Sequence, residues 1–149
     1  MRVFTSVDEL EQAVGTEVGA SEWLTVTQDR VDLFADATDD HQWIHVDVER
    51  AAAGPFGAPI AHGYLTLSLL PSFARQIFRV EARMAVNYGL NKVRFPAPVA
   101  VGSSIRAVVR LLEVTRVGEA VQVVSSTTVE IRGGTKPAVV AETVGRFYL

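Results

Sequence analysis

The sequence lacks cysteine and a net basic charge, and each absence excludes a class of protein. None of the 149 residues is cysteine, so disulfides, thiolate metal sites and cysteine nucleophiles are excluded. Its 14 basic and 17 acidic residues give a net charge of −3. That balance argues against a protein that binds nucleic-acid phosphates through clustered cations. We therefore expect no nucleic-acid partner.

The start of the chain does not have the pattern of a secretory signal. A signal needs a basic start and an apolar run of about 7–15 residues, and Met1–Gly15 has no such run. Ser6 and Glu9 instead have the spacing of a capping box, which predicts a short leading helix that stops near Gly15. The cytoplasm is therefore the expected compartment. No repeat or linker divides the chain, so residues 1–149 are expected to form one domain.

Several enzyme motifs are also missing. The sequence contains no G-x-G-x-x-G or G-x-x-x-x-G-K-[ST] loop, so sites for dinucleotides and nucleotide phosphates lack their usual loops. It contains no G-x-S-x-G elbow either, which disfavours a serine hydrolase. We expect no cofactor.

Apolar residues are abundant nonetheless, and the mean hydropathy is +0.21. The most apolar segment is His62–Val80, where apolar side chains cover nearly every face of a helix. Such a helix is either buried or in a membrane. Pro71, Arg75 and Arg79 interrupt it before about 20 apolar residues accumulate. The segment therefore predicts a buried helix with a kink at Pro71, and no membrane partner is expected.

Upstream of this segment the sequence predicts a short strand and two further helices. Glu22–Val26 is short, apolar and partly β-branched, as a strand would be. Thr27 and Asp47 are good helix caps. The helix after Thr27 should end near Thr38–Asp40, because short polar side chains compete for backbone hydrogen bonds.

Downstream of Ala85 the apolar pattern changes to period two, which is typical of β-strands. The clearest example places four side chains on one face: Ile105, Ala107, Val109 and Leu111. The glycines fall at a spacing that suits the turns of an antiparallel meander: Gly102, Gly118, Gly133–Gly134 and Gly145. Helices first and strands after predict an α+β fold, with a sheet folded around a central helix.

The three histidines all lie between residues 41 and 62. His41 and His45 have the H-x-x-x-H spacing of a zinc motif, but Gln42 replaces the glutamate that would act as general base. No third ligand can be assigned from the sequence. We therefore predict no metal site, and a solvated loop position for His41.

Asp40 and His45 form a sharper candidate pair. Five positions place them about 140° apart around an ideal helix, so they can meet only if the helix ends between them. A carboxylate beside a neutral imidazole can hold and deprotonate one water. The alternative interpretation is a cap aspartate and a structural histidine.

A third candidate is the turn Ile60-Ala61-His62-Gly63 at the start of the apolar helix. Free N–H groups at a helix N-terminus stabilise negative charge, and Gly63 has no Cβ to keep a substrate carbonyl away. The alternative interpretation is a tight turn without function.

The stretch Phe34–His45, with Ala51 six positions on, resembles the hydratase motif of the MaoC-like family. That family contains R-specific enoyl-CoA hydratases and 3-hydroxyacyl-thioester dehydratases. The aspartate and histidine of its pattern fall on Asp40 and His45. Three positions depart, each at a residue that transfers no proton: Asp39 replaces glycine, Gln42 replaces asparagine and Trp43 replaces proline. Two further stretches are similar to the family: Ala58–Gly63, and Asn87–Gly89 with Val93–Pro96.

The resemblance implies a hot-dog fold, a curved antiparallel sheet wrapped around a long helix. It also implies reversible hydration of a trans-2-enoyl-CoA, or of an acyl-carrier thioester, to the (R)-3-hydroxyacyl thioester. Asp40 and His45 would orient and deprotonate the water, and the Gly63 N–H would stabilise the thioester oxygen. Ile60, Ala61 and His62 would belong to the same oxyanion and substrate-binding turn.

The resemblance further implies a substrate channel and a homodimer with sites at its interface. Val86, Asn87, Tyr88 and Gly89 would line the acyl or pantetheine channel, although Tyr88 is equally compatible with a core position. Two rival functions stay open on the same fold: a thioesterase that activates water at the carbonyl, and a non-catalytic module that binds acyl thioesters.

Overall fold

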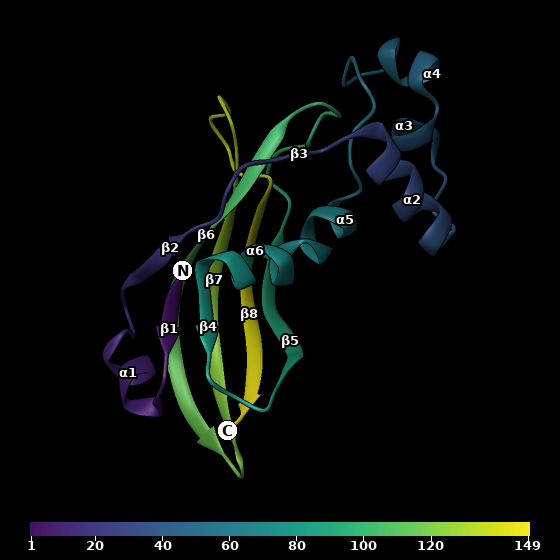
Figure 1. Ribbon diagram of the computed structural model, residues 1–149. Helices are drawn as coiled ribbons and strands as arrows, with labels where there is room; N and C mark the ends of the chain where they lie inside the picture. Colours follow the sequence, from purple (N-terminus) through teal and green to yellow (C-terminus); the bar gives the residue numbers. More distant parts are fainter.

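The main sheet has six strands in the computed structural model, which describes residues 1–149. Five lie in the order β2–β6–β7–β8–β5, each antiparallel to its neighbours, and β3 also pairs with β6 (Figure 1). Their bounds are Glu17–Ala20 (β2), Leu24–Thr25 (β3), Met84–Arg94 (β5), Ser104–Val117 (β6), Ala120–Ile131 (β7) and Val139–Tyr148 (β8). A separate parallel pair joins β1, Arg2–Phe4, to β4, Phe78–Val80.

Six short helices accompany the sheet, and three begin at the caps that the sequence indicates. Ser6, Thr27 and Asp47 each accept a hydrogen bond from a backbone N–H of the first turn. The helices are Val7–Gln12 (α1), Gln28–Thr38 (α2), Trp43–Val46 (α3), Val48–Ala52 (α4), Gly63–Ser68 (α5) and Leu70–Ile77 (α6). The predicted leading helix and the end of α2 near Thr38 are thus confirmed.

The apolar segment from His62 to Val80 is not one kinked helix, as the sequence predicted, but two. The segments α5 and α6 meet at Leu69, and Phe78–Val80 forms β4 instead of a last helical turn. Pro71 lies in the first turn of α6, where its missing N–H leaves no hydrogen bond unmade. A new helix beginning there therefore accommodates the proline better than a kink would.

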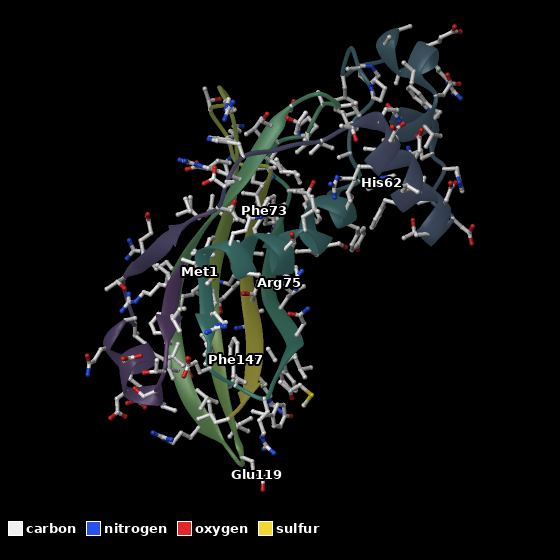
Figure 2. The ribbon with its side chains drawn as sticks, viewed as in Figure 1. Met1, His62, Phe73, Arg75, Glu119 and Phe147 are labelled. Carbon is white, nitrogen blue, oxygen red and sulfur yellow. The ribbon has the colours of Figure 1, made fainter.

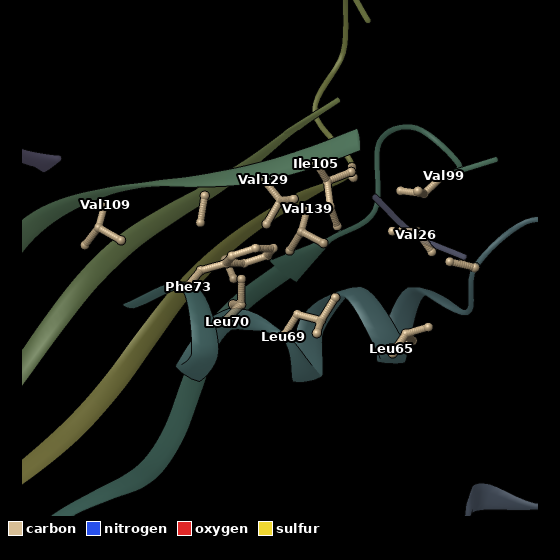
Figure 3. Close-up of a cluster of buried hydrophobic side chains, with 14 of the residues drawn as sticks. Val26, Leu65, Leu69, Leu70, Phe73, Val99, Ile105, Val109, Val129 and Val139 are labelled. Carbon is tan, nitrogen blue, oxygen red and sulfur yellow. The ribbon is translucent and has the colours of Figure 1, made fainter. Parts of the chain in front are cut away.

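The main core lies between these two helices and one face of the sheet (Figure 3). Phe73 is 1% exposed and packs among residues from three strands, including Ile105, Val129 and Val139. The helices are not buried on every face, since Tyr64 is 71% exposed. A second cluster at the other end of the sheet packs α1 and the β1–β4 pair against β6 and β7.

The strand order departs from a simple meander at one place. The strands β6, β7 and β8 follow one another, but β5 pairs with β8 instead of with β6. Gly145 lies inside β8, opposite Asn87, and not at a turn. The predicted strand Glu22–Val26 shortens to β3, Leu24–Thr25.

The helices α2, α3 and α4 project beyond the sheet, past the start of α5 (Figure 1). They meet the rest of the chain where the turn before α5 passes α3, because Ile60 donates its N–H to the carbonyl of Ile44 at 3.0 Å. No helix has the length and apolar character needed to cross a bilayer. The expected compartment and the single domain stay predictions.

We expect Phe73→Ala to lower the free energy of unfolding by about 3–5 kcal/mol, because it removes a buried ring and leaves a cavity. Urea denaturation followed by circular dichroism measures the change. Leu33→Ala is the matched control, since Leu33 is 70% exposed on α2 and should change the free energy by less than about 0.5 kcal/mol. Equal losses in the two variants would contradict this account of the core.

Candidate functional site

The end of α2 brings Asp40 out of the helix. After Thr38 the chain turns at Asp39, whose φ of 59° is left-handed, a conformation that aspartate tolerates better than most residues. Asp40 then lies in an irregular segment with its side chain 51% exposed. Its carboxylate accepts a hydrogen bond from the N–H of Gln42 at 3.3 Å. The helix therefore ends between Asp40 and His45, as their pairing requires.

Two of the three departures from the family motif lie at the start of α3. Trp43 is the first residue of α3, the position that proline favours most in a helix, so replacing a proline there leaves the helix start intact. Gln42 is the cap of α3 and makes no side-chain capping bond. Asparagine caps helices well and glutamine does not lead that ranking, so α3 begins without one stabilising bond.

The ring of His45 is fixed by the turn that precedes α5. Its Nδ1 lies 2.6 Å from the carbonyl oxygen of Ile60, and because a carbonyl can only accept, Nδ1 carries the proton. The amide of Gln28 donates to the carbonyl of His45 at 2.8 Å and holds the backbone of α3. The His45 side chain is buried, and its Nε2 keeps a lone pair in the neutral ring.

His62 lies against both members of the pair. Its Nε2 donates to the backbone carbonyl of Asp40 at 2.9 Å, and its ring stacks on that of His45 with centroids 3.8 Å apart. The ring of Phe34 of α2 also lies beside that of His62, with centroids 5.0 Å apart. Figure 2 shows His62 between the start of α5 and α2.

The structure thus brings Asp40 and His45 together and adds His62 to them. One carboxylate oxygen and one ring nitrogen from each histidine all lie within 4.8 Å of one another. Each histidine has already committed one ring nitrogen as a donor to a backbone carbonyl. The other nitrogen of each neutral ring keeps a lone pair. These three side chains are ligand types that a metal ion can take, and Asp40 and His45 can equally hold and deprotonate one water.

The environment keeps His45 neutral. Burial lowers the pKa of His45, and the nearby His62 lowers it further, while the Ile60 carbonyl and the Asp40 carboxylate act in the opposite direction. A neutral imidazole can accept a proton. His41 is outside this cluster and exposed, as predicted, and its hydrogen bond to Asp36 at 2.9 Å raises its pKa.

Among the four residues of the predicted oxyanion turn, Gly63 keeps its donor free. It begins α5, so its N–H has no acceptor within the helix, and the side chain of His62 does not cap it. Ala61 donates its N–H to the carbonyl of Val99 at 2.8 Å. Ile60 orients His45 through its carbonyl, so both residues serve the shape of the turn.

The backbone at Gly63 lies close to an aromatic side chain. A Cβ there would lie 3.1 Å from the ring of Phe95, the residue that follows β5. Tyr64 contacts the same ring, with centroids 6.1 Å apart. The exposed pair of Tyr64 and Phe95 therefore flanks the free N–H of Gly63.

A cavity of about 470 Å³ lies between the two central helices and strands β5, β7 and β8. Of the predicted channel residues, Asn87, Tyr88 and Gly89 line it and Val86 does not. Tyr88 is 58% exposed and lies over the guanidinium of Arg146, so it is not a core residue. Asp40, His45 and Gly63 do not line this cavity.

Two contacts of the site could not be read from the sequence. His45 and His62 stack although 17 positions separate them, and no periodic pattern links them. The hydrogen bond from Gln28 to α3 was equally unpredictable, because it joins the first turn of α2 to a residue 17 positions away. The place of Phe34 near the site could be predicted, because it is the aromatic residue with which the family motif begins.

Comparison with known proteins gives matches over the whole chain. The family model described as MaoC like domain matches residues 9–132. The 3-hydroxyacyl-thioester dehydratase Z of Mycobacterium tuberculosis is 58% identical over 149 residues, covering 99% of each chain.

Two solved structures are similar in fold. A protein from Archaeoglobus fulgius, described as a monoamine oxidase regulatory protein, superposes with a TM-score of 0.80 at 26% identity, covering 98% of this chain and 95% of that one. An (R)-hydratase from A. caviae superposes with a TM-score of 0.70 at 26% identity, covering 88% and 96%. The predicted α+β hot-dog fold is confirmed.

We expect His41 and His45 to titrate separately in an NMR titration. His45 should titrate below about 6.5, the usual value for histidine, and His41 above it. Because the fold favours neutral His45, stability should be full above about pH 6.5 and should fall as the pH drops towards the folded-state pKa. Single His→Gln variants assign the signals. A His45 midpoint above that of His41 would contradict the burial argument.

Proposed function

The chain belongs to the MaoC-like domain family, and on that premise we propose that it catalyses the reversible hydration of a trans-2-enoyl thioester to the (R)-3-hydroxyacyl thioester. The observation that carries the proposal is the carboxylate of Asp40 within 4.8 Å of a ring nitrogen of the buried, neutral His45. The 58% identity to a 3-hydroxyacyl-thioester dehydratase over the full chain supports it.

In the hydration direction, Asp40 and His45 hold one water and accept its proton as its oxygen attacks C3 of the enoyl group. The two residues then return a proton to C2 on the same face, which restores their starting protonation state. Negative charge grows on the thioester oxygen meanwhile, and the free N–H of Gly63 stabilises it. One such donor contributes about 2.7–4 kcal/mol in comparable sites. Dehydration follows the reverse path, and no covalent acyl-enzyme forms.

The acyl chain fits the cavity beside the two central helices. From Gly63 the first helix leads directly to Leu67 and Ser68, which line that cavity. Nine of its 17 lining residues are apolar, as an acyl chain requires. Asn87 and Gly89 form its wall on β5, in keeping with their predicted role in the channel. The acyl groups of CoA and of carrier-protein thioesters both satisfy this shape.

The protein acts as a homodimer through the outer edge of β5. This strand pairs with β8 alone, and ten of its eleven residues are exposed. Its exposed apolar side chains are Met84, Val86, Tyr88 and Leu90. An exposed, long, apolar edge strand tends to pair with another chain unless it is covered. A second copy of this protein offers the same edge, so two β5 strands can pair with each other. Phe95 follows β5 and its ring lies close to Gly63, so an interface along β5 is adjacent to the site.

Crotonyl-CoA tests the proposed reaction directly. Wild-type protein should remove the enoyl absorbance without releasing free thiol. We expect Asp40→Asn and His45→Gln each to lower kcat by about 10²–10⁴-fold, because both groups act in proton transfer. KM should change little, since the two groups act chiefly in the transition state.

His41→Gln is the matched control for this series, because His41 lies outside the cluster, and it should keep wild-type rates. Release of free thiol by the wild-type protein would identify a thioesterase. Wild-type rates in both Asp40→Asn and His45→Gln would reject the mechanism and leave the non-catalytic binding module.

We expect Val86→Lys to shift the protein from dimer to monomer, because it places a charge on the exposed edge of β5. Sedimentation velocity measures the change. Leu33→Lys introduces the same charge at an exposed leucine of α2 and should leave the dimer intact. A monomeric wild-type protein at micromolar concentration would rule out the homodimer.

A further inference from the structure

The side chain of His62 is buried with one polar atom left without a partner. It is 2% exposed, and because its Nε2 donates to the carbonyl of Asp40, the neutral ring carries its lone pair on Nδ1. That nitrogen has no hydrogen-bond partner. A buried, unsatisfied polar atom lowers stability and calls for an explanation.

Each of the two contacts of His62 could be made by a different side chain. Glutamine would supply an N–H to the Asp40 carbonyl, and phenylalanine would supply a ring to stack on His45. Among side chains of about this size, histidine alone supplies both, at the cost of the unpartnered Nδ1. The combination of the two contacts is therefore what distinguishes a histidine at this position.

The two contacts of His62 restrain the Asp40 backbone and the His45 ring plane, which the other hydrogen bonds of the site do not fix. The carboxylate of Asp40 is half exposed, and its hydrogen bond is a 3.3 Å contact with the N–H of Gln42. The peptide of Asp40 is held by Nε2 of His62. On the other side, Ile60 holds one edge of the His45 ring, and the stack on His62, with 25° between the planes, sets the ring plane.

We propose that His62 is a positioning residue for the hydration reaction, which fixes the Asp40 peptide through Nε2–H and the His45 ring plane through its face. This inference rests on the proposed function. It gives the side chain of His62 a role separate from the backbone of the oxyanion turn. The donor to Asp40 carries the larger effect, because it alone holds the peptide that bears the carboxylate.

Three variants of His62 separate the contacts in steady-state kinetics with crotonyl-CoA. Phe keeps the ring and loses the donor, Gln keeps the donor, and Asn loses the ring and is too short to reach the Asp40 carbonyl. We expect His62→Phe and His62→Asn to lower kcat by about 10–100-fold, as misplacement of a reacting group by about 1 Å does. KM should stay within about twofold in both, and His62→Gln should restore most of kcat.

A double-mutant cycle with Asp40→Asn decides whether His62 acts through Asp40. In the Asp40→Asn background, His62→Phe should lower kcat by less than about threefold, because coupled residues are not additive. His62→Asn provides the same cycle if the Phe variant does not fold. Phe73→Leu, which alters the core away from the site, controls for stability and should leave kcat unchanged despite a lower Tm.

The outcomes separate this inference from the function on which it rests. If wild-type protein does not hydrate crotonyl-CoA, the proposed function fails and the role of His62 fails with it. If wild-type protein hydrates the substrate but His62→Phe lowers kcat by the same factor in both backgrounds, the positioning role alone is overturned. Failure of His62→Gln to exceed His62→Asn in kcat would also overturn it.

Discussion

The hydrogen bond from Nδ1–H of His45 to the carbonyl of Ile60 is the interaction on which the site depends. It joins the projecting helices to the turn that begins α5, and it sets the tautomer of the ring. With Nδ1 protonated, Nε2 holds the lone pair that a base needs. The same turn presents Gly63 one peptide beyond His62, so one short loop aligns the base and the oxyanion donor.

The central helices and the sheet give this loop a rigid support. Leu65 of α5 and Phe73 of α6 are packed in the main core, while the N-terminal end of α5 lies at its margin. The helix α2 is anchored to the same core by Val31, and hydrogen bonds to the carbonyls of Asp40 and Ile60 then position the reacting groups beyond its end. Burial of His45 among these contacts also lowers its pKa, so the contacts that orient the ring also favour its neutral state.

How much of this could be predicted from the sequence depended on how local each feature is. The caps at Ser6, Thr27 and Asp47 and the end of α2 follow from neighbouring residues, and they were predicted. The pairing of β5 with β8 was not, since the order of strands depends on long-range packing that periodicity does not encode. The stack of His62 on His45 escaped prediction for the same reason. Pro71 indicated a disturbance of the helix correctly, but not that a second helix would begin there.

Asp39 shows what the family motif specifies at one of its positions. Its φ of 59° is left-handed, and the motif has glycine there because glycine adopts that conformation freely. An ordinary residue in this region costs about 1–2 kcal/mol, with aspartate among the few that visit it routinely. Glycine would also increase the conformational entropy of the unfolded chain, which costs about 0.4–1 kcal/mol of stability. The two effects largely offset each other, so at this position the motif specifies a backbone angle more than a residue type.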